Sequence, residues 1–162
     1  MSTLVLVLVG ALVVLRVLGK QLTGSFVTAK SLVLMPAILI VIGLGGAVAA
    51  VGAARPSEIL FFLVDAAVVV GLGLARGATA RLSMRDGNLF QKGTPVTIVL
   101  WLATIAVRVG AGFLGHALGI EGALTAASAL MLFGITIAAQ NAMIYFRAQQ
   151  RRLPLAMAVP RR

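Results

Sequence analysis

Residues 31–53 read SLVLMPAILIVIGLGGAVAAVGA, and this uncharged apolar run decides the fold class of the chain. An apolar segment of about 20 residues is long enough to cross a bilayer as a helix. The rest of the chain has the same character, since 60% of its 162 residues are hydrophobic, 11% are charged and the mean hydropathy is +1.09. Soluble domains carry about 25% charged residues. The composition therefore predicts an integral membrane protein.

On either side of this run, four more apolar segments predict further helices. The expected fold is an all-α membrane protein, a transmembrane bundle of about five helices over residues 1–146, followed by a basic cytoplasmic tail at 147–162. The expected spans are about 4–18, 31–53, 59–75, 96–114 and 123–146. In the first span the positive charge follows the apolar run, whereas it precedes the run in a signal peptide. We therefore expect residues 4–18 to be an uncleaved span.

The positive residues are distributed unevenly between the connections. They populate the first connection, the third connection and the tail, as Arg16, Lys20, Lys30, Arg76, Arg81, Arg85, Lys92, Arg147, Arg151, Arg152, Arg161 and Arg162. The second and fourth connections hold only Arg55. Positive loops are retained on the cytoplasmic side. The expected orientation has the amino terminus outside and the carboxyl terminus in the cytoplasm.

The third connection contains a stretch whose alternation differs from that of the spans. Asp86-Gly87 is a favoured two-residue turn, because both positions tolerate positive φ. Residues 81–93 are therefore expected to form a short cytoplasmic β-hairpin between the third and fourth helices, with Met84 opposite Leu89. The same register places Leu82 opposite Gln91.

One face of this hairpin is basic. Arg81, Arg85 and Lys92 are expected on it, opposite a mostly apolar face. Two interpretations stay open. The hairpin is either a solvated loop that only satisfies the positive-inside rule, or a docking surface for a partner or for anionic lipid headgroups.

Two ionisable side chains are expected at membrane depth, Asp65 in the third span and Arg108 in the fourth. Each lies about seven residues from the outer end of its helix, so an ion pair between antiparallel neighbours is expected. Such groups are costly in a bilayer and are candidate functional residues. Either the pair fixes helix rotation, or it is the candidate catalytic site for a ligand.

Further polar side chains inside the spans are expected to be structural. Gln140 and Asn141 form a second polar spot on the fifth span, and Arg16 lies at a comparable depth on the first. Interhelical hydrogen bonding accounts for such residues.

Composition excludes several function classes. The chain has no cysteine and one histidine, so a thiolate nucleophile and a multi-histidine metal site are excluded, and no cofactor is expected. The net charge is +10, but the basic residues flank apolar spans. We therefore expect them to contact anionic headgroups of the lipid bilayer and expect no nucleic acid as a partner.

The stretch from Gly71 to Arg108 carries a family resemblance. It contains Arg76-Gly77, the basic hairpin, Gln91-Lys92-Gly93-Thr94-Pro95 and then a helix with Arg108. This pattern resembles the CcdC-like family of small bacterial integral membrane proteins, a domain of unknown function. The resemblance implies a multi-pass protein of the bacterial cell membrane, and it brings no catalytic residues with it.

Three hypotheses for the function follow. The first is an accessory or scaffold protein without catalysis, which presents the basic hairpin and tail to a membrane protein partner or to a second copy. The second is a membrane-embedded enzyme on a lipid-like or isoprenoid substrate, in which Asp65 and Arg108 act. The third is a small transporter or transporter subunit.

Overall fold

The computed structural model describes residues 19, 23–120 and 123–154. The predicted span 4–18, with Arg16, and residues 155–162 of the predicted tail lie outside the described residues. The elements follow in the order β1 Ser25–Phe26, α2 Ala29–Val51, α3 Pro56–Thr79, β2 Arg81–Arg85, β3 Asn88–Lys92, α4 Pro95–Ala117, α5 Ala123–Ala127 and α6 Ala129–Gln150.

Four of these helices, α2, α3, α4 and α6, are long and apolar enough to cross a membrane. They contain 22 to 24 residues each. At 1.5 Å per residue such helices are about 33–36 Å long, slightly more than the hydrocarbon core of about 30 Å. The chain is thus a multi-pass membrane protein, and its described residues contain four of the five expected spans.

The distribution of side chains supports lipid as the surrounding solvent. Large apolar side chains face outward, with Val41 69% and Phe113 74% exposed. Polar side chains lie inside, and Arg76, Thr136 and Gln140 are buried. A soluble protein shows the opposite arrangement, because water stabilises polar surface and lipid stabilises apolar surface.

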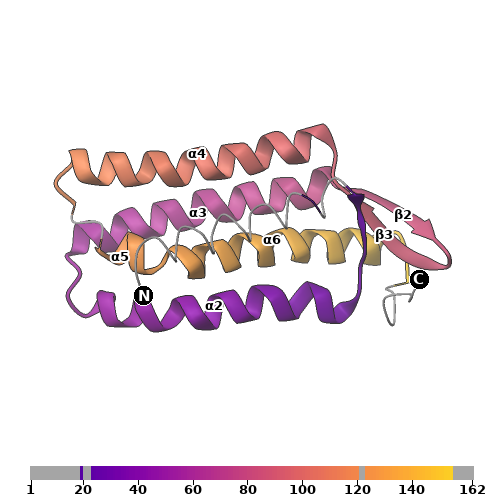
Figure 1. The fold of residues 1–162 in the computed structure, drawn as a ribbon, viewed down its shortest axis with the longest axis horizontal. Helices are drawn as coiled ribbons and strands as arrows, with labels where there is room; N and C mark the ends of the chain where they lie inside the picture. The colour runs from indigo at the N-terminus through magenta and orange to yellow at the C-terminus, as the bar shows by residue number, and fades with distance from the viewer. Residues whose placement is uncertain (1–18, 20–22, 121–122, 155–162) are drawn as a thin grey trace.

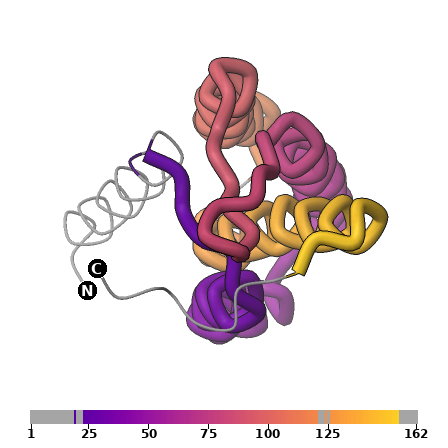
Figure 2. Tube along the Cα trace, turned by 90° about the vertical axis from the view of Figure 1, so that its right-hand side faces the viewer, coloured from indigo at the N-terminus to yellow at the C-terminus, as the bar shows by residue number. Residues whose placement is uncertain are grey.

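The helices run side by side along the long axis of the molecule (Figure 1). Helix α6 packs against both α2 and α3, and α4 packs on α3. In the end-on view of Figure 2, the segments that form the sheet lie across the ends of the helices. The last helix in the sequence is therefore the central one, and it joins α2 to the α3–α4 hairpin.

A pair of glycines allows α3 and α6 to approach closely. Gly73 and Gly77 are one turn apart on α3, in the small-xxx-small spacing typical of tight membrane helix pairs. A Cβ added at Gly73 would collide with the carbonyl oxygen of Thr136, and one at Gly77 with that of Gln140. Hydrogen at both positions is what lets the backbones touch.

The predicted hairpin is present, but it belongs to a larger sheet than expected. Strands β2 and β3 pair with Met84 opposite Leu89 and Leu82 opposite Gln91, as predicted. The turn residues Asp86 and Gly87 have φ values of 52° and 73°. The expectation of two strands is wrong, because β1 adds a third on the other edge of β3, in the order β1-β3-β2. The extra strand stabilises a hairpin that would be marginal alone.

The sheet is anchored in the bundle by a small apolar core. This core contains Val27, Ala80, Leu89, Ile144 and Ala148, all buried. Leu89 of the central strand and Ile144 of α6 are fully buried. The sheet is thus packed directly on one end of the bundle.

Two helices continue past their predicted carboxyl-terminal ends for the same physical reason, and the division of the fifth span at Ser128 is a separate difference. The fifth span is divided at Ser128 into α5 and α6, and α6 continues past 146 to Gln150, so that Arg147 is helical instead of beginning the tail. Likewise α3 continues past residue 75 to Thr79 and includes Arg76. Hydropathy alone ends a span at an arginine, but here both arginines have acceptors inside the fold.

The glycine contact predicts a difference between two matched substitutions. Gly73→Ala is expected to lower the free energy of unfolding by about 1–3 kcal/mol, because its methyl group collides with α6. Gly71→Ala, two residues away, meets nothing within 4 Å and is expected to be neutral or slightly stabilising. SDS-induced unfolding in mixed micelles measures both variants. Equal losses would contradict the close approach of α3 and α6.

Candidate functional site

The most elaborate polar site lies around a buried arginine. Arg76 is 0% exposed, and its Nε donates to Gln140 Oε1 at 3.0 Å. Its Nη2 donates to Thr136 Oγ1 at 2.8 Å, and its Nη1 donates to Thr104 Oγ1. The guanidinium carbon lies 4.2 Å from the ring centroid of Trp101. The Arg76 side chain, which extends from α3, thus contacts α4 through Thr104 and Trp101 and contacts α6 through Thr136 and Gln140.

The two threonine hydroxyls are oriented to accept from the guanidinium. Thr136 Oγ1 donates to the carbonyl of Val69 at 2.7 Å, and Thr104 Oγ1 donates to the carbonyl of Leu100 at 2.8 Å. Because each hydroxyl has one hydrogen and that hydrogen is committed, its lone pairs face Arg76. The acceptors are therefore fixed before the cation is placed.

The charge of Arg76 is compensated by dipoles and by an aromatic face. No carboxylate among the described residues pairs with it, since the ion pair found there joins Asp65 and Arg108. A desolvated cation over a tryptophan face gains about 2 kcal/mol. A buried charge of this kind is costly unless its geometry is well satisfied, so it fixes the rotation of α3 strongly.

Sequence reasoning missed this site. It assigned Arg76 to the third connection and predicted only that Gln140 would bond between helices, without its partner. The available signal was the Gly73-x-x-x-Gly77 spacing, which places Arg76 one residue from a close helix contact.

The predicted pair of Asp65 and Arg108 does form. Asp65 is 4% exposed, and its second oxygen, Oδ1, has no hydrogen-bond partner in the described part of the chain. A cavity of about 200 Å³ is lined by Arg108 together with Phe61 and Ile120, whereas Asp65 does not line it. The carboxylate is therefore closed inside the bundle.

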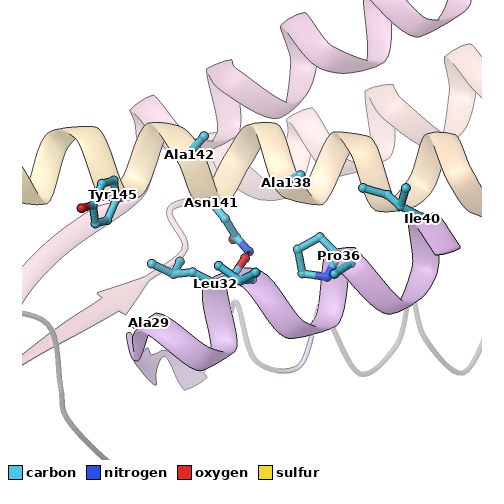
Figure 3. Close-up of a pocket in the computed structure, with 10 residues that line it drawn as sticks. Ala29, Leu32, Pro36, Ile40, Ala138, Asn141, Ala142 and Tyr145 are labelled. Carbon is cyan, nitrogen blue, oxygen red and sulfur yellow. Dashed lines mark hydrogen bonds between the residues drawn. The ribbon is translucent and has the colours of Figure 1, made fainter.

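The other predicted polar residue, Asn141, compensates for a proline. Pro36 is inside α2 and has no N–H, so the carbonyl of Leu32 loses its helical partner. Asn141 Nδ2 of α6 donates to that carbonyl at 2.8 Å. Figure 3 shows the Asn141 side chain reaching from α6 to α2 beside the proline ring. The predicted interhelical hydrogen bond thus has a specific cause.

The predicted basic surface is partly gathered into a hollow. A groove of about 480 Å³ at the sheet end, called the basic groove below, is lined by Arg81, Lys92, Arg147 and Arg151. Arg85 lies outside it, with its guanidinium 5.6 Å from the ring of Phe90. No carboxylate is among the residues that line the groove.

One of these four cations is fixed by the end of a helix. Arg147 Nη1 donates to the carbonyls of Gly77 and Ala80, each at 2.8 Å, where α3 ends. A cation is stabilised there by the helix dipole. The other three side chains, Arg81, Lys92 and Arg151, are exposed.

Metal ligands do not gather in the described residues, where no three His, Asp or Glu side chains lie together. Comparison with known proteins adds no relative: no protein-family profile, curated protein or solved structure matches the chain.

The role assigned to Asn141 can be tested by a double-mutant cycle with Pro36. Asn141→Leu is expected to cost about 1–2 kcal/mol of unfolding free energy, because the carbonyl of Leu32 loses its donor. In a Pro36→Ala background the new backbone N–H donates to the Leu32 carbonyl and restores one helical hydrogen bond. The cost of Asn141→Leu is then expected to fall to about a few tenths of a kcal/mol. SDS titration of the four proteins gives the coupling. Independent, additive costs would show that the two residues do not serve one carbonyl.

A second cycle tests the buried cation. Gln140→Leu is expected to cost about 2–3 kcal/mol, because a charged N–H donor is left without an acceptor. In an Arg76→Met background the same change removes an amide that has already lost its partner, and the cost is expected to fall below about 1 kcal/mol. Thermal unfolding in detergent measures both costs. The network would be refuted by equal losses in the two backgrounds.

Proposed function

We propose that this protein is a small, non-catalytic membrane scaffold of the CcdC-like kind, which binds an acidic segment of a partner protein in its basic groove. The observation that carries the proposal is the pairing of Arg81 with Lys92. These two cations face each other directly across neighbouring strands, where like charges destabilise a sheet. An anionic ligand between them removes that repulsion.

The setting of the pair supports binding. Arg147 and Arg151 of α6 line the same groove, so four cations surround one hollow. The sheet beneath them packs on α6 through a core that includes Leu89 of β3 and Ile144 of α6, both fully buried. A rigid support lowers the entropy lost on binding, because the cations are already gathered.

The topology that accompanies this proposal has the sheet end in the cytoplasm, the amino terminus outside and the chain in the bacterial cell membrane. The bias of positive residues toward the sheet end supports the orientation. The resemblance of Gly71 to Arg108 supports the family and the bacterial membrane.

The enzyme hypothesis has less support. It needs substrate to reach Asp65, which is 4% exposed and contacts Arg108. The cavity of about 200 Å³ beside this pair is lined by the arginine and not by the carboxylate. A structural role for the pair therefore accounts for the observations.

The scaffold proposal is tested with two triple variants that remove the same charge. Arg81→Gln, Lys92→Gln and Arg151→Gln neutralise the groove, whereas Lys30→Gln, Arg55→Gln and Arg85→Gln neutralise exposed cations that do not line it. Each protein is placed in neutral phosphatidylcholine nanodiscs, and binding of a fluorescent polyglutamate peptide is measured by anisotropy. We expect the groove triple to weaken binding about tenfold to a hundredfold, because each surface ion pair contributes up to about 1 kcal/mol.

The control triple is expected to weaken binding by no more than about threefold, since only the long-range field changes. Equal losses in both triples would mean that the peptide responds to net charge alone, and the groove would not be a docking site. If the groove triple instead loses affinity for phosphatidylglycerol vesicles and not for the peptide, the groove binds lipid headgroups and the scaffold proposal is wrong.

A further inference from the structure

Two adjoining hollows lie at the sheet end of α2 and α6, apart from the basic groove. The first, the apolar groove, has a volume of about 530 Å³ and runs between α2 and α6, lined by Leu32, Pro36, Ile40, Ala138, Asn141 and Tyr145 among others (Figure 3). The second, the polar cavity, has a volume of about 100 Å³ and is lined by Ser25, Ser31, Gln91, Trp101, Gln140 and Asn141 among others. Leu32 and Asn141 line both hollows, so the two adjoin on either side of the hydrogen bond from Asn141 Nδ2 to the Leu32 carbonyl.

Two residues that line the polar cavity carry hydrogen-bonding groups without a partner in the described part of the chain. Trp101 is 1% exposed, and its Nε1–H has no partner among the described residues. The same holds for Oε1 of Gln91, which also lines the cavity. An unsatisfied buried polar group is costly, and a ligand group that accepts from the Trp101 indole removes that part of the cost.

The surroundings of the cavity favour a negative group. Arg76 lies directly behind its wall, 4.2 Å from the Trp101 ring centroid and hydrogen-bonded to Gln140 Oε1. Because that oxygen is occupied, the amide NH₂ of Gln140 remains to donate, as does the Trp101 indole. Both donors are polarised by the same cation. The Gln91 amide presents its NH₂ after half a turn about its last bond.

The apolar groove has the position and length of a lipid chain. It begins at Ala29, where α2 starts at the sheet end, and reaches Ile40. These 11 residue steps correspond to about 16 Å, which is about half of the hydrocarbon core. Its volume falls within the range of about 300–1,000 Å³ that is typical of ligand sites.

We propose that the polar cavity and the apolar groove form one binding site for a single-chain amphiphile with a small anionic headgroup, of the fatty-acid or polyprenyl-monophosphate class. The headgroup accepts hydrogen bonds from Trp101 and Gln140, and the chain lies between α2 and α6 toward the middle of the bilayer. The polar cavity, at about 100 Å³, is much smaller than the apolar groove, at about 530 Å³, which suits a small headgroup such as a carboxylate or a phosphate.

The tryptophan of the cavity supplies the measurement, because Trp101 is the one tryptophan of the chain. The full-length protein in phosphatidylcholine nanodiscs is titrated with oleate, farnesyl monophosphate and uncharged oleyl alcohol, and Trp101 emission is recorded. We expect a saturable change with at least one anion, and binding of the alcohol about tenfold weaker, because it lacks the charge that Arg76 favours. The two anions distinguish a carboxylate from a phosphate headgroup.

Two matched variants test the groove. Ala142→Leu fills it, whereas Ala106→Leu adds the same bulk at an exposed position of α4 that lines neither hollow. We expect the first to weaken binding of the anion about tenfold or more and the second to leave it unchanged.

Three results would overturn the proposal. If none of the three amphiphiles changes the Trp101 emission, the polar cavity binds none of them and contains only water. Equal affinity for oleate and oleyl alcohol would show that the site does not prefer an anionic headgroup. Because the chain has no native cysteine, a Leu8→Cys, Ala142→Cys pair can be crosslinked by oxidation. Efficient crosslinking that excess oleate does not slow would show that residues 4–18 occupy the groove.

Discussion

The guanidinium of Arg76 is the constraint on which the arrangement of the bundle depends. A cation that is 0% exposed inside four apolar helices must find acceptors, and they come from Thr104 on α4 and from Thr136 and Gln140 on α6. These contacts are possible only where α3 and α6 nearly touch, which Gly73 and Gly77 allow on either side of the arginine. One charge thus fixes the rotation of α3 and its distance from two neighbours.

The two ends of the bundle solve the problem of buried charge differently. Away from the sheet, Asp65 and Arg108 compensate each other, so the pair leaves little field around it. Near the sheet, Arg76 has dipoles and an aromatic ring around it and no described carboxylate. The basic groove lies at the same end. The sheet end therefore concentrates positive charge both inside the bundle and on its surface.

How far the sequence could predict this structure depends on the range of each interaction. Spans are visible because hydropathy is local, and the hairpin register followed from one turn, Asp86-Gly87. The contact between Asp65 and Arg108 followed from counting residues along two sequential helices. Strand β1 was missed because two residues carry no alternation, and Arg76 was missed because its acceptors lie 28 to 64 residues away. What a hydropathy pattern cannot supply is the partner that makes a buried polar group tolerable.

The same requirement explains why the candidate ligand site lies where it does. In lipid every backbone polar group needs a partner inside the protein. Asn141 serves the carbonyl that Pro36 leaves unpaired, and Arg147 serves those at the end of α3. Gln140 satisfies Arg76 with one half of its amide and keeps the other half, which lines the polar cavity. Side chains recruited to complete the fold thus carry unused hydrogen-bonding capacity, and that capacity gathers where the helices meet the sheet. A binding site at this junction requires no residue beyond those that the fold already needs.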